Sequence, residues 1–99
     1  MAIMEIGIIP VGTGLPSVSD HVADAIKVIP KDKKIKYTLT SMGTILEGDL
    51  DRLMNLAKKM HRAVLKGDVK RVITSIKIDE RLDKELSMEG KVEAVREKL

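Results

Sequence analysis

Residues 35–48, IKYTLTSMGTILEG, decide the fold, because they predict a β-hairpin between two helices. From Ile35 to Met42, apolar and polar side chains alternate as they do in a half-buried strand. Gly43 permits a tight turn, and Thr44 to Glu47 is expected to form the returning strand. The other predicted elements are placed relative to this hairpin.

A strand and a helix are predicted before the hairpin. The segment from Ile3 to Val11 is rich in β-branched residues and is followed by a loop rich in proline and glycine, which predicts a strand and then a loop. Ser17 or Ser19 is expected to cap a helix that Pro30 terminates. The apolar residues of this helix recur every three or four positions, at Val18, Val22, Ala25, Ile26 and Ile29.

A helix, a strand and a last helix are predicted after the hairpin. The helix starts at Gly48 and Asp49 and ends in the order cation then glycine, at Lys66 and Gly67. The segment from Val69 to Ile78 predicts the fourth strand. The last helix carries apolar residues at helical spacing: Met88, Val92, Val95 and Leu99.

This order of elements predicts an α+β fold, a ferredoxin-like βαββαβ sandwich with an extra C-terminal helix. Residues 1–99 are expected to form a single domain. Right-handed crossovers place both helices on one face of a four-stranded antiparallel sheet, so the other face is uncovered. We expect the sheets of two chains to pair or pack through that face, which carries Thr38, Thr40, Ile73 and Ser75.

Composition excludes several classes of function. The chain has no cysteine, so disulfides, thiolate nucleophiles and cysteine-bound metals are ruled out. Tyr37 is the only aromatic residue, which argues against a base-stacking RNA platform. The lysines between residues 31 and 36 are interrupted by Asp32 in a predicted loop, and we expect a solvated turn rather than contact with nucleic acid. No stretch is long enough to span a membrane and none resembles a signal peptide, so a cytoplasmic location without membrane contact is expected.

No constellation of catalytic residues is apparent. The Gly12-Thr13-Gly14 turn lacks the remaining residues of a phosphate loop or a dinucleotide fingerprint. His21 and His61 lie on different helices, so we expect neither a metal site nor a cofactor. The protein is therefore not expected to be an enzyme. An enzyme that binds a phosphorylated metabolite at residues 12–19 is the least favoured alternative.

The hairpin also carries a candidate binding site. Ser41 and Thr44 supply two hydroxyls, and Glu47 supplies one carboxylate. If Glu47 faces a cleft between subunits, it can neutralise a cationic ligand while the hydroxyls form a polar ring around an apolar ligand body. An ordinary hairpin with an exposed glutamate explains the same residues equally well, and both interpretations stay open at this point.

The chain resembles the YkoF-like thiamine-binding protein family over nearly its whole length. The order and spacing of several short stretches carry the resemblance, together with the last helix. These stretches are Ile9-Pro10-Val11-Gly12-Thr13 with Ser17-Val18-Ser19, Tyr37 to Thr40, Met42-Gly43-Thr44 with Glu47-Gly48, and Lys77-Ile78-Asp79 with Arg81.

The resemblance implies a ferredoxin-like fold that assembles through its sheets into homodimers and often homotetramers. It also implies binding of thiamine or its hydroxymethylpyrimidine portion without catalysis. The ligand-binding positions that it carries over are Ser19, Ser41, Met42, Gly43, Thr44 and Glu47. The leading hypothesis is thus a non-catalytic small-molecule binding protein. The alternative is a structural or regulatory oligomer whose sheet face serves only subunit assembly.

Overall fold

The hairpin predicted at residues 35–48 is present in the computed structural model, which describes residues 1–99. It lies within a four-stranded antiparallel sheet of order β2-β3-β1-β4, which confirms the predicted α+β fold. The elements in chain order are β1 (Ala2–Val11), α1 (Ser19–Lys27), β2 (Lys36–Thr40), β3 (Gly43–Gly48), α2 (Leu50–Val64), β4 (Arg71–Glu80) and α3 (Met88–Arg96).

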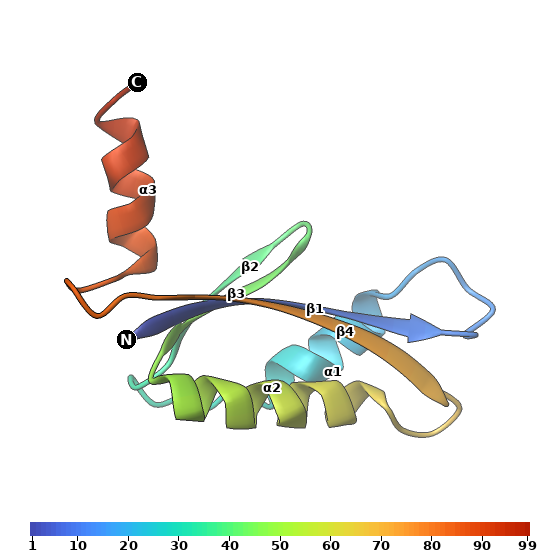
Figure 1. The fold of residues 1–99 in the computed structure, drawn as a ribbon. Helices are drawn as coiled ribbons and strands as arrows, with labels where there is room; N and C mark the ends of the chain where they lie inside the picture. Colours follow the sequence, from blue (N-terminus) through green and yellow to red (C-terminus); the bar gives the residue numbers. More distant parts are fainter.

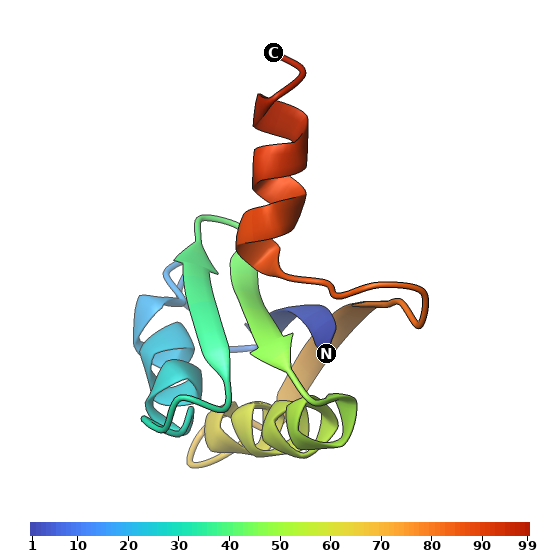
Figure 2. The ribbon, with the colours of Figure 1, turned by 90° about the vertical axis from the view of Figure 1, so that its left-hand side faces the viewer.

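Two helices cover one face of the sheet, and the third stands on the other side. Helices α1 and α2 lie beneath the sheet in Figure 1, where α2 packs against β1, β3 and β4. Helix α3 projects from the opposite side (Figure 1, Figure 2). None of the three helices has both the length and the apolar character required to cross a membrane. The largest fully buried side chains lie between the sheet and α2: Met4, Ile6, Leu46, Leu53, Met60 and Val64.

The strand register defines the two faces of the sheet. Side chains of paired residues share a face, so Tyr37 lies with its partner Leu46 on the helix-covered face. On the uncovered face, which we call the open face, Ile9 is paired with Ile73. The residues predicted to share the uncovered face all lie there: Thr38, Thr40, Ile73 and Ser75.

Helix α2 follows the sequence signals closely. The Asp49 carboxylate caps it by accepting a hydrogen bond from the Arg52 backbone N–H at 3.2 Å. Its apolar stripe is buried against the sheet. The helix ends at Val64, and the chain turns at Gly67, whose φ of +58° lies in the left-handed region that favours glycine.

Two predicted local features differ in the structure. No side chain caps α1: Val18 occupies the N-cap position, and the Ser17 and Ser19 hydroxyls lie 3.4 Å from each other instead. The predicted serine cap is therefore wrong. Strand β4 starts two residues later than predicted, because the Val69 N–H donates to the Lys66 carbonyl at 3.0 Å and closes a turn.

Candidate functional site

Strand β1 is longer than its neighbour β3, and this difference leaves a gap in the sheet. The pairing of β1 with β3 ends at Ile6 and Thr44, whereas its pairing with β4 continues to Val11 and Arg71. From Gly7 onward, the side of β1 that faces the hairpin has no neighbouring strand. Backbone N–H and C=O groups that point away from β4 there are free to bind another molecule.

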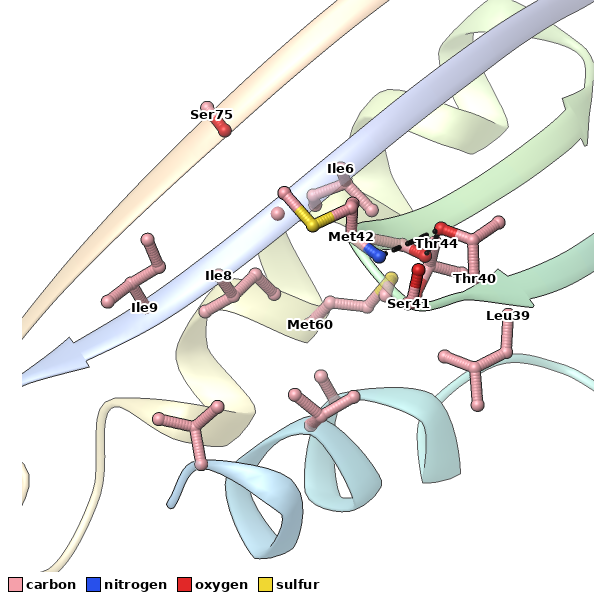
Figure 3. Close-up of a pocket in the computed structure, with 15 residues that line it drawn as sticks. Ile6, Ile8, Ile9, Leu39, Thr40, Ser41, Met42, Thr44, Met60 and Ser75 are labelled. Carbon is pink, nitrogen blue, oxygen red and sulfur yellow. Dashed lines mark hydrogen bonds between the residues drawn. The ribbon is translucent and has the colours of Figure 1, made fainter. Parts of the chain in front are cut away.

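A cavity of about 320 Å³ occupies this gap (Figure 3). One wall is β1 from Ile6 to Ile9, and the other is the hairpin from Leu39 to Thr44. Helix α1 contributes Val22 and Ala25, and Met60 of α2 closes the cavity from below the sheet. Residues from both faces of the sheet therefore meet in one cavity.

The cavity is mainly apolar and contains a few hydroxyls. Nine of its 15 lining residues are hydrophobic, so it suits an apolar ligand body better than a highly charged one. The Thr40 hydroxyl is already engaged, because it donates to the Gly43 carbonyl at 2.7 Å and accepts from the Met42 N–H at 3.2 Å. Ser41, Thr44 and Ser75 provide the other hydroxyls. Such a cavity can hold a small, flat molecule with a few polar atoms.

The hairpin turn lies very close to β1. A Cβ atom on Gly43 would lie 3.1 Å from the Ile6 carbonyl oxygen, so only glycine allows this approach without displacement. Beside Gly43, Thr44 is buried, whereas Met42 is 88% exposed at the tip. Met42 therefore stands at the mouth of the cavity and Thr44 in its interior.

Four of the six predicted ligand-binding residues come together in this cavity. They are Ser41, Met42, Gly43 and Thr44, which all line it. Ser19 does not line it; it is exposed in the first turn of α1, next to the lining residue Val18.

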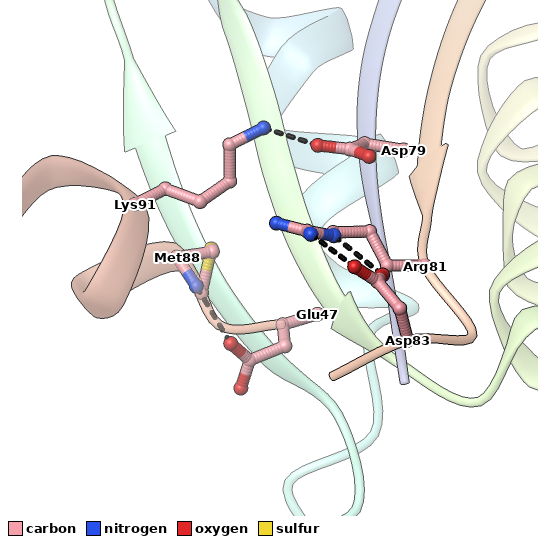
Figure 4. Close-up of polar contacts among 6 residues, drawn as sticks. All are labelled: Glu47, Asp79, Arg81, Asp83, Met88 and Lys91. Carbon is pink, nitrogen blue, oxygen red and sulfur yellow. Dashed lines mark hydrogen bonds and ion pairs between the residues drawn. The ribbon is translucent and has the colours of Figure 1, made fainter. Parts of the chain in front are cut away.

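Glu47 also lies apart from the cavity. It is three residues from Thr44 along β3, about 10 Å, and on the opposite face of the sheet. Glu47 as a whole is 7% exposed, and its Oε1 accepts a hydrogen bond from the Met88 N–H at 2.8 Å (Figure 4). Since Met88 begins α3, the carboxylate lies at the positive end of the helix dipole. The role of Glu47 as a ligand counter-charge stays a prediction.

A different carboxylate lies nearer to the hairpin tip. The Glu5 Cγ atom is 3.8 Å from the position that a Cβ on Gly43 would occupy. Glu5 is exposed and shares the open face with Gly7, which lines the cavity. Sequence patterns do not point to Glu5, Gly7 or Met60 as neighbours of the hairpin, because the pairing of β1 brings the first two there and the packing of α2 beneath the sheet brings Met60. They place Ser75 on the open face but not at this cavity. No sequence motif links them.

Charged pairs fix the connection between β4 and α3 (Figure 4). Arg81 binds both carboxylate oxygens of Asp83, and Lys91 of α3 pairs with Asp79 of β4. The hydrogen bond from Arg81 holds the pKa of Asp83 below its usual value, and it raises the pKa of Arg81 in turn. No three His, Asp or Glu side chains are grouped so that they could hold a metal ion.

Comparison with known proteins gives a match over almost the whole chain. A family model described as thiamine-binding protein matches residues 4–96. UPF0045 protein YqgV of Bacillus subtilis is 43% identical, over 100% of this chain and 98% of the relative. UPF0045 protein MJ1052 of Methanocaldococcus jannaschii is 47% identical, over 96% of this chain and 92% of the relative.

Solved structures resemble the fold as well. The crystal structure of MJ1052 has a TM-score of 0.87 at 47% identity and covers 97% of this chain and 96% of its own. A Thermotoga maritima protein named for thiamine biosynthesis/salvage has a TM-score of 0.72 at 23% identity, with coverage of 96% and 98%. At 23% identity, the likeness to the Thermotoga maritima protein shows the fold alone.

Proposed function

The chain belongs to the thiamine-binding protein family, and on that premise we propose that it is a non-catalytic small-molecule binding protein. Its ligand is thiamine or the hydroxymethylpyrimidine portion of thiamine, and it acts as a homodimer or homotetramer assembled through its sheets. The observation that carries this proposal is the cavity between β1 and the hairpin, which includes four predicted ligand-binding residues.

The size of the cavity favours a small heterocycle. Its volume of about 320 Å³ is at the lower end of the roughly 300–1,000 Å³ of known ligand pockets. A single pyrimidine ring fits inside, and the second ring of thiamine would extend toward the mouth beside Met42. No lining side chain carries a carboxylate, an imidazole or an amine that could activate a hydroxyl, which supports binding rather than catalysis.

The polar groups of the cavity suit an aminopyrimidine. Its ring nitrogens accept hydrogen bonds and its amino group donates them, and the free edge of β1 from Gly7 to Ile9 offers both kinds of partner. The Thr44 and Ser75 hydroxyls add two more groups. Since the cavity has no aromatic side chain, Ile8, Met42 and their aliphatic neighbours sandwich the ring.

The direct test is isothermal titration of the full chain with thiamine and, separately, with hydroxymethylpyrimidine. We expect saturable heat with at least one of them. Thr44→Val, which removes only the buried hydroxyl, should weaken binding by about 0.5–1.5 kcal/mol. Thr38→Val is the matched control, because Thr38 is exposed on the same hairpin and does not line the cavity, and it should bind as the unchanged chain does. Absence of heat with both ligands at millimolar concentration rejects the thiamine assignment.

The counter-charge for the thiazolium ring has two candidates. Family resemblance favours Glu47, and the position beside the hairpin tip favours Glu5. Replacing the acid that pairs with the ligand by glutamine should cost about 1.5–3 kcal/mol of thiamine affinity. Because hydroxymethylpyrimidine has no thiazolium, the loss should be smaller for that ligand. Titrating Glu5→Gln and Glu47→Gln with both compounds therefore identifies the acid. If both variants bind thiamine as tightly as the unchanged chain does, neither acid is the counter-charge.

A structural or regulatory oligomer without a ligand is the second candidate. It is favoured by the open face, where Ile9 and Ile73 are 59% and 51% exposed. Self-association with no heat from either titration would favour this function over ligand binding.

A further inference from the structure

A second cavity lies at the edge of the sheet, where β2 has no neighbouring strand on its outer side. Its volume is about 490 Å³, and it shares no lining residue with the cavity between β1 and the hairpin. The loop from α1 to β2, the first half of β2 and the first turn of α3 form its walls. Its lining includes three lysines and the only aromatic residue of the chain: Lys31, Lys33, Lys36 and Tyr37.

The loop that carries the first two of these lysines is held in place from three directions. Ile35, at its end, belongs to the hydrophobic core. The Asp32 carboxylate accepts a hydrogen bond from the Lys34 N–H at 2.9 Å and closes a turn. The loop also lies close to β3, because a Cβ atom on Gly48 would be 3.2 Å from the Lys34 carbonyl oxygen. The loop therefore presents its lysines to the cavity from a fixed backbone.

None of the three lysines in this cavity is ion-paired. The ion pairs of the chain involve four other cations: Lys27, Lys66, Arg81 and Lys91. Asp32 and Glu89 also line the cavity, so the lysines outnumber the acids, and the Asp32 carboxylate is engaged by a backbone N–H. A set of unpaired ammonium groups around a cavity favours a ligand with phosphate groups.

Tyr37 adds a flat apolar surface beside these lysines. The strand register places it on the helix-covered face, yet it is 47% exposed, because α2 packs beneath the other three strands and leaves β2 largely uncovered. A planar ring can stack on an exposed tyrosine. One aromatic side chain serves one ring, whereas a polynucleotide platform needs several.

We infer that this cavity binds a phosphorylated compound with one planar ring, the chemical class to which nucleotides belong. Lysines hold the phosphate groups and Tyr37 holds the ring. Because consecutive residues of a strand point to opposite faces, Lys36 and Tyr37 flank the free edge of β2 from its two sides. The unpaired backbone groups of that edge face the polar atoms of the ring. The volume lies within the roughly 300–1,000 Å³ of known ligand pockets.

The single tyrosine makes the test specific for this site. Because the chain has no other Tyr, Phe or Trp, the ring protons of Tyr37 give a distinct NMR signal. ADP is the probe; adenosine, without phosphate, and inorganic pyrophosphate, without a ring, are the comparison compounds. We expect ADP to shift the signal saturably and to bind roughly tenfold more tightly than either comparison compound. No saturable shift at millimolar ADP overturns the inference. Adenosine or pyrophosphate that binds as tightly as ADP also overturns it, because the site then does not recognise both groups.

Isothermal titration of variants with ADP locates the site. Lys33→Gln/Lys36→Gln should weaken binding roughly tenfold. Lys58→Gln/Lys59→Gln is the matched control, because it changes the net charge equally at exposed positions of α2 outside the cavity, and it should bind as the unchanged chain does. All four lysines are exposed, so folding should be retained. Equal losses in the two double variants would mean attraction by net charge alone and overturn the site.

The outcome is separable from the proposed function. Since the two cavities share no lining residue, Lys33→Gln/Lys36→Gln should leave the affinity for thiamine unchanged. Binding of ADP and binding of thiamine can therefore each succeed or fail without deciding the other.

Discussion

Gly43 is the residue at which the hairpin and β1 come closest. A methyl group there would lie 3.1 Å from the Ile6 carbonyl oxygen, which belongs to a paired strand and cannot move alone. Gly43→Ala should therefore push the hairpin outward and lower the free energy of unfolding by about 1–3 kcal/mol. Urea denaturation measures this change, with Ser41→Ala, an exposed neighbour on the turn, as the control. An unchanged midpoint would show that the hairpin adjusts without cost.

Glu47 anchors the start of helix α3 to the sheet. Its carboxylate satisfies the first N–H of α3, so Glu47→Ala should speed hydrogen exchange of the Met88 amide. Glu47→Gln keeps an acceptor oxygen but loses the charge, which is worth about 0.3–1 kcal/mol at a helix N-terminus, and should have a smaller effect. Amide exchange followed by NMR measures both variants. Unchanged Met88 exchange in Glu47→Ala would contradict this anchoring role.

At the residue level, the sequence pointed to part of the cavity lining. Ser41 and Thr44 were recognisable because their hydroxyls flank the turn predicted at Gly43. Glu47 is only three residues further on, but an odd separation along a strand places it on the other face. Its contact with Met88 joins residues 41 positions apart, and no local pattern predicts such a pair.

At the level of elements, the strands and helices could be predicted but the extent of their pairing could not. Alternation and apolar stripes are local signals, so β2, β3 and α2 appear close to their predicted positions. The cavity depends instead on β3 ending its pairing at Ile6 while β4 continues to Val11. That difference follows from the lengths of three strands packed together, which no single segment encodes.

The ion pair between Arg81 and Asp83, in the segment between β4 and α3, should weaken in acid. Because Arg81 lowers the pKa of Asp83, the ion pair contributes stability above the ordinary aspartate pKa and loses it as the pH falls through the lowered pKa. Arg81→Met should bring the pKa of Asp83 back toward its ordinary value, as an NMR titration of the carboxyl carbon would record. The effect on global unfolding should be small, because the pair is exposed to solvent. An identical Asp83 titration in the variant would argue against this pair in solution.

At the level of the whole molecule, the chain is more extended than its length requires. Its radius of gyration is 14.8 Å, against about 13 Å for a compact domain of this size. Helix α3, which stands clear of the sheet, accounts for the excess (Figure 2). The sequence predicted the helix and its apolar residues, but not that the helix stands clear of its own sheet, because no local pattern encodes the surface on which a helix packs.

If the chains associate through their sheets, as proposed above, thermal stability must depend on protein concentration. Only 18 of 99 residues are buried in the isolated chain, so burial between copies should add substantially to stability. For a dimer that unfolds to two chains of this length, a tenfold rise in concentration should raise Tm by about 3–4 °C. Ile73→Asp, which places a charge on the open face, should melt at a lower temperature that does not change with concentration. Ala94→Asp, at an exposed position of α3, is the control and should behave as the unchanged chain. Circular dichroism from about 2 to 200 μM tests this, and a constant Tm for the unchanged chain would mean that folding does not depend on association.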